Sequence, residues 1–542
     1  MTIGLTEEND NSSARYHTEN DAFKHDQGHS LINGLMQPEC YDHPVVELQL
    51  IETYISWVIL TGHYAYKIKK PINLGFLDYL SLENRHFYCQ QELRLNQRLT
   101  RELYLEVVTI TGTSQSPQIS GQGKVIEYAV KMIQFPQSVQ LDRMLMQGAV
   151  TNFHIDAFAK LIATFHQNID IADSAVGYGD PESLIKPVIE NFTEIAEQLS
   201  DYRQLEKINK LKNWAVSTAG NLKSIFEQRK LQGFIRECHG DCHLRNMAWF
   251  KNKPLLFDCI EFDSNLRWID VISEIAFLYM DLQKNQSHQL AHRFLNYYLE
   301  HTGDYAGVAV LPFYLSYRAL VRAKVEAIQT AQEKCHSSQQ VASNKASIMQ
   351  YLQLAQGYCH TVKPKLIITC GFSACGKTTL SQKLLERLGA IRIRSDVERK
   401  RLFGIRAEDS GHSKIEHNIY STLASQQTYT KLLELADGLL DSGFSVIIDA
   451  ACLKPEQRKP FQDLAESKQI PYLILNITAS ADTLLQRIKQ RDKGASDANY
   501  EILQHQLLTT KGIKQEEVSH VIQINTEKSL NVENLLKDIE KY

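Results

Sequence analysis

The sequence predicts a two-domain protein, an α+β domain followed by an α/β domain with a parallel sheet. Two observations predict this. Segments rich in β-branched and aromatic residues at 45–62 and 124–135 alternate with long helical patterns in the first part of the chain. At 363–389, a strand, a glycine-containing loop and an amphipathic helix follow one another, which is how a βαβ layer opens.

The composition is that of a globular protein. Apolar residues make up 43% of the chain and charged residues 23%, so both domains can bury a core. The net charge of −4 provides no general attraction to nucleic acid or to an anionic membrane. The ten cysteines are irregularly spaced, and no apolar run approaches the ~18 residues of a membrane span. We expect a cytoplasmic protein with reduced thiols and no membrane partner, and the negative charge argues against a nucleic-acid ligand.

The chain divides into four predicted segments. Residues 1–38 are polar and are expected to be disordered, and residues 39–332 form the first domain. Residues 333–362 form a linker or connecting helix, and residues 363–542 form the second domain. Within the first domain we expect strands over 45–62, 63–72 and 124–135, a helix over 80–99, mostly helix over 151–232, and short strands and loops over 233–263.

The second domain opens with "GFSACGKTT", which fits the phosphate-binding pattern G-x-x-x-x-G-K-[ST]. Small residues let backbone N–H groups surround phosphate oxygens, and the helix that follows points its positive end at the anion. Lys377 is expected to contact the β- and γ-phosphates of ATP, and Thr378 to hold Mg²⁺. The predicted ATP-binding residues are Gly371, Phe372, Ser373, Ala374, Cys375, Gly376, Lys377, Thr378 and Thr379.

Four further residues shape this predicted site. Asp396 follows the second strand, where a carboxylate either takes the proton of an acceptor hydroxyl or caps the next helix. Asp449 ends the apolar strand "FSVIID" and is either a ligand of Mg²⁺ or a carboxylate in an ordinary turn. Arg487 and Arg491, four residues apart, either stabilise transition-state charge as parts of a lid or form a solvated basic face.

These motifs give the second domain a resemblance to the small P-loop kinases grouped with zeta-toxin, polynucleotide kinase and chloramphenicol phosphotransferase. That group has an "SD…R" segment after the second strand, a later "V-I-x-D-A" strand and a lid with arginines, and this chain has "SDVER" and "VIIDA". The resemblance implies phosphoryl transfer to a hydroxyl. It does not name the hydroxyl.

In the first domain, residues 238–246 read "CHGDCHLRN". Two cysteines and two histidines raise the question of a zinc site, but structural zinc usually takes two ligand pairs set ~12 or more residues apart. The same stretch has the H-x-D-x-x-x-x-N spacing of a kinase catalytic loop. In that interpretation Asp241 orients and deprotonates the acceptor hydroxyl, and Asn246 binds Mg²⁺.

Three more residues complete this pattern in kinase order. Asp258 follows a strand and is expected to bind Mg²⁺ beside the nucleotide phosphates. Lys67, on a strand, and Glu92, on the next helix, are expected to clamp the α- and β-phosphates. Lys69 lies on the same face of the strand as Lys67, so spacing does not choose between them. The alternative is that all of these are surface charges or buried caps.

The first domain resembles the aminoglycoside phosphotransferase and choline-kinase-like family, whose "HGDLHxxN" segment corresponds to "HGDCHLRN". The whole chain is similar to the bifunctional aminoglycoside phosphotransferase/ATP-binding proteins, which carry "YKIKKP", "LENR", "HGDxHxRN", "FDCIEF" and "YRALVRAKV" ahead of a P-loop domain. The resemblance implies a protein-kinase-like fold for the first domain.

The hypothesis from the sequence is an ATP-dependent phosphotransferase with two Mg-ATP sites. Each site transfers the γ-phosphate to the hydroxyl of a small molecule. Two alternatives stay open: one active kinase whose other domain is a regulatory nucleotide sensor, or a protein whose P-loop domain binds nucleic-acid ends.

Overall fold

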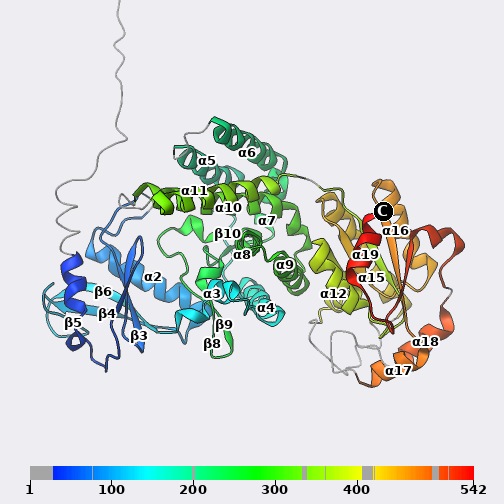
Figure 1. The fold of residues 1–542 in the computed structure, drawn as a ribbon, viewed down its shortest axis with the longest axis horizontal. Coiled ribbons are helices and arrows are strands. Elements are labelled where there is room, and N and C mark those ends of the chain that lie inside the picture. The colour runs from blue at the N-terminus through cyan, green and yellow to red at the C-terminus, as the bar shows by residue number, and fades with distance from the viewer. Residues whose placement is uncertain are drawn as a thin grey trace, which may run out of the picture.

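The computed structural model describes residues 28–75, 77–197, 202–332, 338–360, 362–405, 419, 421–490, 500–510 and 512–542. In Figure 1 an antiparallel sheet lies at one end of the molecule, a helical region in the middle and a parallel sheet at the other end. The two predicted fold classes are thereby confirmed. None of the helices in these ranges is long and apolar enough to cross a membrane.

The first sheet has six strands, all antiparallel, in the order β1-β2-β3-β6-β4-β5. Its strands and the helix that crosses it are β1 (Gln49–Glu52), β2 (Ser56–Leu60), β3 (Tyr64–Lys69), α2 (Leu82–Thr100), β4 (Tyr104–Gly112), β5 (Pro117–Ile119) and β6 (Val125–Ile133). The segment at 45–62, predicted to be strand-forming, contains the two strands of a hairpin, β1 and β2. Helix α2 begins after Ser81, whose hydroxyl accepts the backbone N–H of Asn84 and caps the helix.

A helix at residues 28–35 corrects the expectation that residues 1–38 are all disordered. Leu31, Ile32 and Leu35 are buried in a cluster with Trp57 and Tyr66 of the sheet. Apolar residues at this spacing share one face of a helix, and that face gains free energy by leaving water. Residues 1–27 lie outside the described ranges.

The middle region is mainly helical, as predicted. Its elements are α3 (Leu141–Met146), α4 (Asn152–Asn168), α5 (Pro181–Glu197), α6 (Tyr202–Asn221), α7 (Lys223–Leu231), β7 (Ile235–Glu237), β8 (Met247–Phe250), β9 (Lys253–Leu256), β10 (Trp268–Asp270), α8 (Val271–Lys284), α9 (His288–Thr302), η5 (Tyr305–Val310) and α10 (Leu311–Gln332). β7 pairs with β10 and β8 with β9, both antiparallel. Helix α8 is central, with every residue from Val271 to Leu282 buried.

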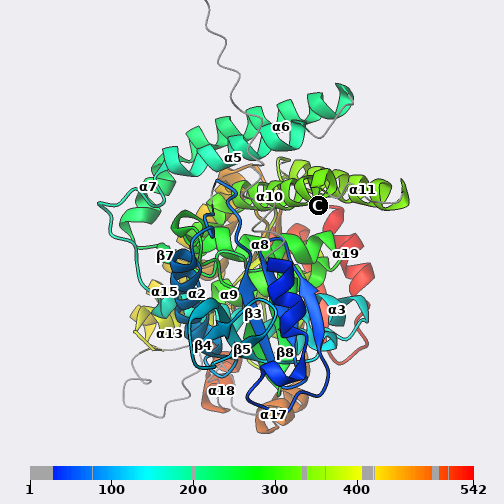
Figure 2. The same cartoon turned by 90° about the vertical axis from the view of Figure 1, so that its left-hand side faces the viewer.

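The segment predicted as a linker or connecting helix contains helix α11 (Ser338–Gly357). This helix lies along α10, as Figures 1 and 2 both show. Ile348, Tyr351, Leu352 and Ala355 are buried in the main core, so α11 is packed as part of the helical region. The second domain begins with β11 at Leu366, close to the predicted boundary.

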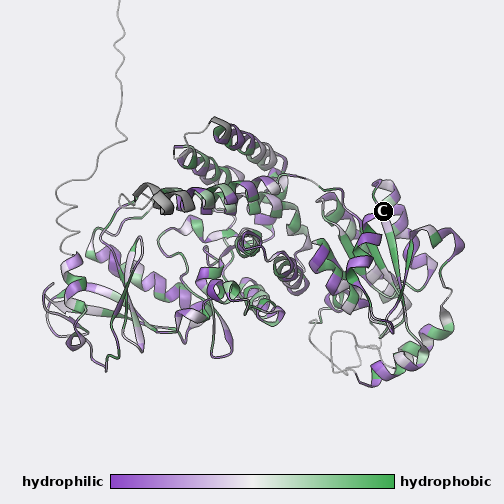
Figure 3. Cartoon of the chain, viewed as in Figure 1, coloured by the Kyte–Doolittle hydropathy of each residue, from purple (hydrophilic) through white to green (hydrophobic). Residues whose placement is uncertain are grey.

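The second domain is a five-stranded parallel sheet in the order β12-β13-β11-β14-β15. Its elements are β11 (Leu366–Cys370), α12 (Lys377–Leu388), β12 (Ile391–Arg394), α13 (Ser395–Leu402), α15 (Thr422–Asp441), β13 (Val446–Asp449), α16 (Pro455–Ser467), β14 (Tyr472–Thr478), α17 (Ala481–Lys489), α18 (Tyr500–Thr509), β15 (Val521–Asn525) and α19 (Val532–Glu540). Its three central strands, β13, β11 and β14, are mainly apolar, as expected for strands covered by helices on both faces, and green dominates this sheet in Figure 3.

The two domains share a hydrophobic core. One cluster of buried side chains runs from Phe294 and Leu295 of α9 to Ile391 and Ile393 of β12. Helix α9 packs against α12 and β12, so the middle region adjoins one edge of the parallel sheet. The edge that adjoins it is the one nearest to Asp396.

Candidate active sites

The first candidate site is a cavity of about 1400 Å³ between the antiparallel sheet and the helical region. Lys67, Asp241, Asn246 and Asp258 all line it, although they come from four different segments of the chain. Glu92 lies behind the cavity wall and is fully buried. The structure thus brings together all five residues that the kinase-like pattern selects.

Lys67 is the centre of the charge network. Its Nζ lies 2.8 Å from Glu92 Oε1 and also contacts Asp258 Oδ1, a residue 191 positions away in the sequence. Burial alone lowers the pKa of this lysine, but Asp258 and Glu92 raise it well above its ordinary value. The ammonium group is therefore held charged between two carboxylates, in the position where a nucleotide phosphate can bind it.

Lys69 lies in a different position from Lys67, which the spacing along the strand did not reveal. Its Nζ lies 2.8 Å from Glu92 Oε2 and contacts Glu261 Oε1, and it is fully buried. It does not line the cavity, whereas Lys67 does. Lys69 therefore neutralises Glu92 behind the cavity wall and Glu261, which lines the cavity. Glu261 was not singled out in the sequence, because nothing in its spacing separates it from other acidic residues in the loop.

The "CHGDCHLRN" segment lies between β7 and β8. Asn246 Nδ2 donates to Asp241 Oδ2 at 2.9 Å, and His243 Nε2 lies 3.2 Å from the same oxygen. His239 is buried, which lowers its pKa and keeps the ring neutral. With its proton on Nε2, the ring donates to Phe257 O at 2.8 Å and accepts the Asp241 N–H at Nδ1.

The Asp241 carboxylate is held ionised. Burial alone raises its pKa, but His243 and Arg322 lower it below its usual range. The loop itself is held from behind by Glu274, which accepts the backbone N–H of His239 at 2.9 and 3.0 Å. An ionised acceptor with a fixed backbone is suited to orient the hydroxyl of a phosphoryl acceptor.

The cysteines of this segment are free and buried, and Cys238 lies beside Glu274. Across the described ranges, one group of three potential metal ligands lies within 4.8 Å, namely His166, Cys238 and Glu274. This group does not include Cys242 or His243.

Asp258 follows β9 and has a φ of 66°, in the left-handed region. Its backbone N–H donates to the Tyr104 hydroxyl at 3.1 Å, which holds the residue in this conformation. A non-glycine residue in such a conformation stores strain, and this occurs most often at functional sites. The conformation brings the carboxylate to Lys67.

The second candidate site is a cavity of about 1030 Å³ at the carboxyl ends of β11, β12 and β13. The loop after β11 contains Gly371 and Gly376, with φ of 155° and 100°. A Cβ atom at Gly371 would lie 2.3 Å from Ile477 O, so no other residue fits there. Lys377 Nζ donates to Phe372 O at 2.8 Å and to Gly371 O at 3.1 Å, so it lies over the loop.

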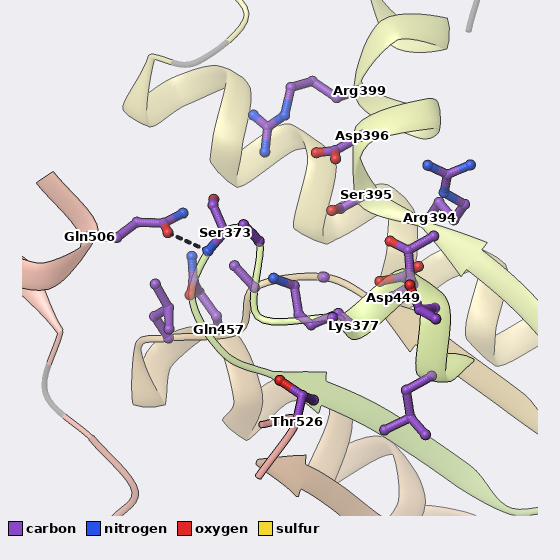
Figure 4. A pocket seen from close by; sticks show the side chains of 18 of the residues that line it. Ser373, Lys377, Arg394, Ser395, Asp396, Arg399, Asp449, Gln457, Gln506 and Thr526 are labelled. Carbon is purple, nitrogen blue, oxygen red and sulfur yellow. Dashed lines mark hydrogen bonds between the residues drawn. The ribbon is translucent and has the colours of Figure 1, made fainter. Parts of the chain in front are cut away.

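Figure 4 shows the predicted residues Asp396 and Asp449 at this cavity. Asp449 ends β13, and its Oδ2 accepts the Ser381 hydroxyl at 3.0 Å. Asp396 lies in the first turn of α13 and lines the cavity, while the N-cap position is held by Arg394, whose side chain makes no capping bond. The N-cap alternative for Asp396 is therefore not supported.

Arg487, on α17, lies against the P-loop. Its Nη1 donates to Thr526 Oγ1 at 2.9 Å, and its Nη2 donates to Thr526 O at 3.1 Å. Arg491 lies outside the described residues.

Other residues that line this cavity were missed in the sequence. Gln506 accepts the Ser373 N–H at 2.9 Å, and Arg394, Gln457 and Thr526 line the cavity. No motif marks them.

Two family models match the chain. Residues 91–311 match the Phosphotransferase enzyme family, and residues 366–512 match an AAA domain. The chain therefore combines a segment similar to the Phosphotransferase enzyme family with a segment similar to an AAA domain. Both matches support a kinase or phosphotransferase enzyme, and such families use ATP with a divalent metal.

An uncharacterized protein of Mycobacterium tuberculosis is 29% identical over 466 residues, which is 85% of this chain and 91% of that protein. A span of that length must include parts of both domains. Among solved structures, amicoumacin kinase hAmiN with AMP-PNP, Ca²⁺ and Ami is 12% identical, with a TM-score of 0.38, and the match covers 62% of this chain and 96% of that one. A sugar kinase from Janibacter sp. is 20% identical, with a TM-score of 0.25, over 33% of this chain and 94% of that one.

Proposed function

We propose that this fusion of two kinase-like domains is a phosphotransferase with two Mg-ATP sites, each of which transfers the γ-phosphate to the hydroxyl of a small molecule. The observation that carries the proposal is the contact of Lys67 with both Glu92 and Asp258 in the cavity that Asp241 also lines. Such a set of charges is suited to hold a nucleotide beside an acceptor hydroxyl.

In the first site, Lys67 binds the nucleotide phosphates and Asp241 accepts the proton of the acceptor hydroxyl. Because Asp241 is ionised at neutral pH, it can orient the hydroxyl before transfer begins. Little covalent chemistry is needed from the protein, since positioning and charge stabilisation lower the barrier.

In the second site, the P-loop N–H groups and Lys377 bind the phosphates, and Asp396 accepts the proton of the acceptor. Arg487 supplies positive charge beside the loop, and Arg491 is proposed to do so from the lid. The acceptors of both sites are small molecules with a free hydroxyl.

The donor atoms fit magnesium. Asp258 and Asn246 in the first site, and Thr378 and Asp449 in the second, offer the oxygen ligands that hard cations prefer. When bound, Mg²⁺ would neutralise part of the charge that develops on the transferred phosphoryl group.

The test is a calorimetric titration with a non-hydrolysable ATP analogue and Mg²⁺. We expect two sites per chain, one lost in Lys377→Ala and the other in Asp258→Ala. A protein that binds no nucleotide contradicts the proposal. A single site, lost only in Lys377→Ala, would leave the first domain without its proposed activity.

A second candidate is one active kinase whose other domain senses nucleotide. The buried core shared by α9 and β12 favours it, because a packed interface can transmit a change between the domains. Measuring the turnover of each site in Asp241→Ala and in Lys377→Ala distinguishes two independent kinases from one kinase with a nucleotide sensor. If each change lowers only its own site's activity, the domains are not coupled.

A further inference from the structure

Helix α9 of the first domain fixes the edge of the parallel sheet. The side-chain amide of Asn296 pairs with strand β12: Nδ2 donates to Ala390 O at 3.0 Å, and Oδ1 accepts the Arg392 N–H at 2.7 Å. An edge strand would otherwise leave such backbone groups unpaired. A side chain of the first domain therefore pairs with backbone groups at the edge of the P-loop sheet.

One turn further along α9, Glu300 reaches two arginines of β12. Its Oε1 accepts Arg394 Nη1 at 2.5 Å, and its Oε2 accepts Arg392 Nη2 at 3.1 Å. Burial alone raises the pKa of Glu300, but Arg394 and Arg392 lower it, so the carboxylate stays charged. The backbone carbonyl of Glu300 also accepts a hydrogen bond from Arg401 of α13.

Both arginines connect Glu300 to the P-loop site, Arg392 through Ser381 and Arg394 by lining the cavity. Arg392 Nη1 lies 3.4 Å from Ser381 Oγ, and that hydroxyl donates to Asp449. Arg394 lines the cavity itself, beside Asp449 in Figure 4. Arg394 is in register with Asp449, and β13 separates β12 from the P-loop strand β11. Arg394 is therefore on the far side of Asp449 from the P-loop.

We infer that Glu300 is a positioning residue of the P-loop site: the first domain holds Arg394 on the acceptor side of Asp449, where its guanidinium binds the phosphoryl group during transfer. The inference rests on the proposed function of this site. An arginine is suited to this role because its planar guanidinium offers five N–H donors. Nη1 is used on Glu300, and the side chain still borders the cavity.

The same interface contains a matched control. Arg293 of α9 donates to Glu386 of α12 at 2.7 Å, and neither residue lines the cavity. The Glu386 side chain has 15% of its surface exposed and that of Glu300 11%, so the two carboxylates are buried to a similar degree. If Glu300 only stabilised the contact between the domains, Glu300→Gln and Glu386→Gln would have equal effects on turnover.

The experiment compares Glu300→Gln, Glu386→Gln, Arg394→Gln and the double variant Glu300→Gln/Arg394→Gln, all in an Asp258→Ala background that silences the first site. P-loop-dependent ATP turnover gives kcat and KM, and MgADP titration counts folded sites. We expect Glu300→Gln to lower kcat on the order of tenfold with KM for ATP little changed, as loss of an outer-shell partner does. Glu386→Gln should change neither kcat nor KM for ATP. The double variant should be no slower than Arg394→Gln, because Glu300 acts through Arg394.

Where turnover without the acceptor is too slow, MgADP with aluminium fluoride replaces it as a mimic of the transferred group. Aluminium fluoride should increase the affinity for MgADP about tenfold less in Glu300→Gln than in the unsubstituted protein. The affinity of Glu300→Gln for MgADP alone should be unchanged. Equal effects of Glu300→Gln and Glu386→Gln, or effects of Glu300→Gln and Arg394→Gln that multiply, would overturn the inference. Absence of Lys377-dependent MgADP binding in the unsubstituted protein would instead overturn the proposed function.

Discussion

In the first domain the charged groups proposed to bind nucleotide come from side chains far apart in sequence, whereas in the second the proposed phosphate-binding groups come from one loop and the helix behind it. Lys67 and Asp258 meet across 191 residues. Residues 371–379 form the P-loop without a break. A site built from distant side chains depends on the packing of two lobes, and a site built from backbone depends on local conformation. Different substitutions should therefore disrupt the two sites: those that alter packing between lobes at the first, and those that alter backbone conformation at the second.

The largest expected effect separates the two lysines of β3. Lys69→Met leaves Glu261 buried without its cation and Glu92 with Lys67 alone, and we expect it to lower the free energy of unfolding by about 3–5 kcal/mol. Lys67→Met should cost much less stability, since Lys69 still neutralises Glu92 and Asp258 borders the cavity, yet it should abolish nucleotide binding at the first site. Guanidinium unfolding and calorimetry measure the two effects. Equal loss of stability in both variants would contradict this assignment.

The next prediction concerns the backbone of the second site. Gly371→Ala places a Cβ 2.3 Å from Ile477 O, and we expect nucleotide binding at the P-loop to weaken by about 2–3 kcal/mol, or roughly 30- to 150-fold. The matched control is Gly438→Ala in helix α15, where a Cβ meets no atom within 4 Å. That change should leave binding intact and slightly stabilise the helix. Normal binding by Gly371→Ala would refute the close approach.

Acid should weaken the first site through its buried carboxylates. Burial alone raises the pKa of Glu274, but His166, whose Nε2 lies 3.8 Å from Glu274 Oε2, lowers it to about 2. Because the folded pKa is below the unfolded value, Glu274 contributes stability above about pH 4.5 that is lost as the pH falls toward 2. We expect a loss of about 2 kcal/mol between pH 6 and pH 3. Glu274→Gln should flatten this dependence in unfolding experiments, and an unchanged slope would exclude Glu274 as its source.

The smallest expected effect concerns Asp258. Tyr104→Phe removes the acceptor of the Asp258 N–H, and we expect a loss of about 1 kcal/mol in stability with a small loss of nucleotide affinity at the first site only. Tyr88→Phe, on α2 and outside the cavity lining, serves as the control. An effect on the P-loop site would show that the two sites are less separate than their construction suggests.

Most of the fold was predictable because its signals are local. The β-branched runs, the helical periodicity of 80–99 and the strand-loop-helix around Gly371 each depend on a few neighbouring residues. The helix at 28–35 was missed because its apolar face is short and has meaning only against the sheet that it covers. The turn between β1 and β2 within 45–62 was not located, because the strand-forming composition continues across it.

The candidate sites were predictable to the extent that their spacing is fixed by chemistry. The P-loop, "CHGDCHLRN" and Asp258 have a required order along the chain. Gln506, Thr526 and Arg394 have no such order, since they reach the cavity from separate elements. Lys67 and Lys69 were indistinguishable because alternate residues of a strand share a face.

The sequence by itself determined the two domains, the loop with the phosphate-binding pattern and the order of the kinase-like residues, because each of these follows from residues that are neighbours or from spacing along one element. Only the tertiary structure decided which lysine borders the cavity and which lies beneath it, and that Glu300 of one domain holds Arg394 of the other. These facts depend on how separate elements pack, and burial and charge pairing are settled only when distant side chains come into contact.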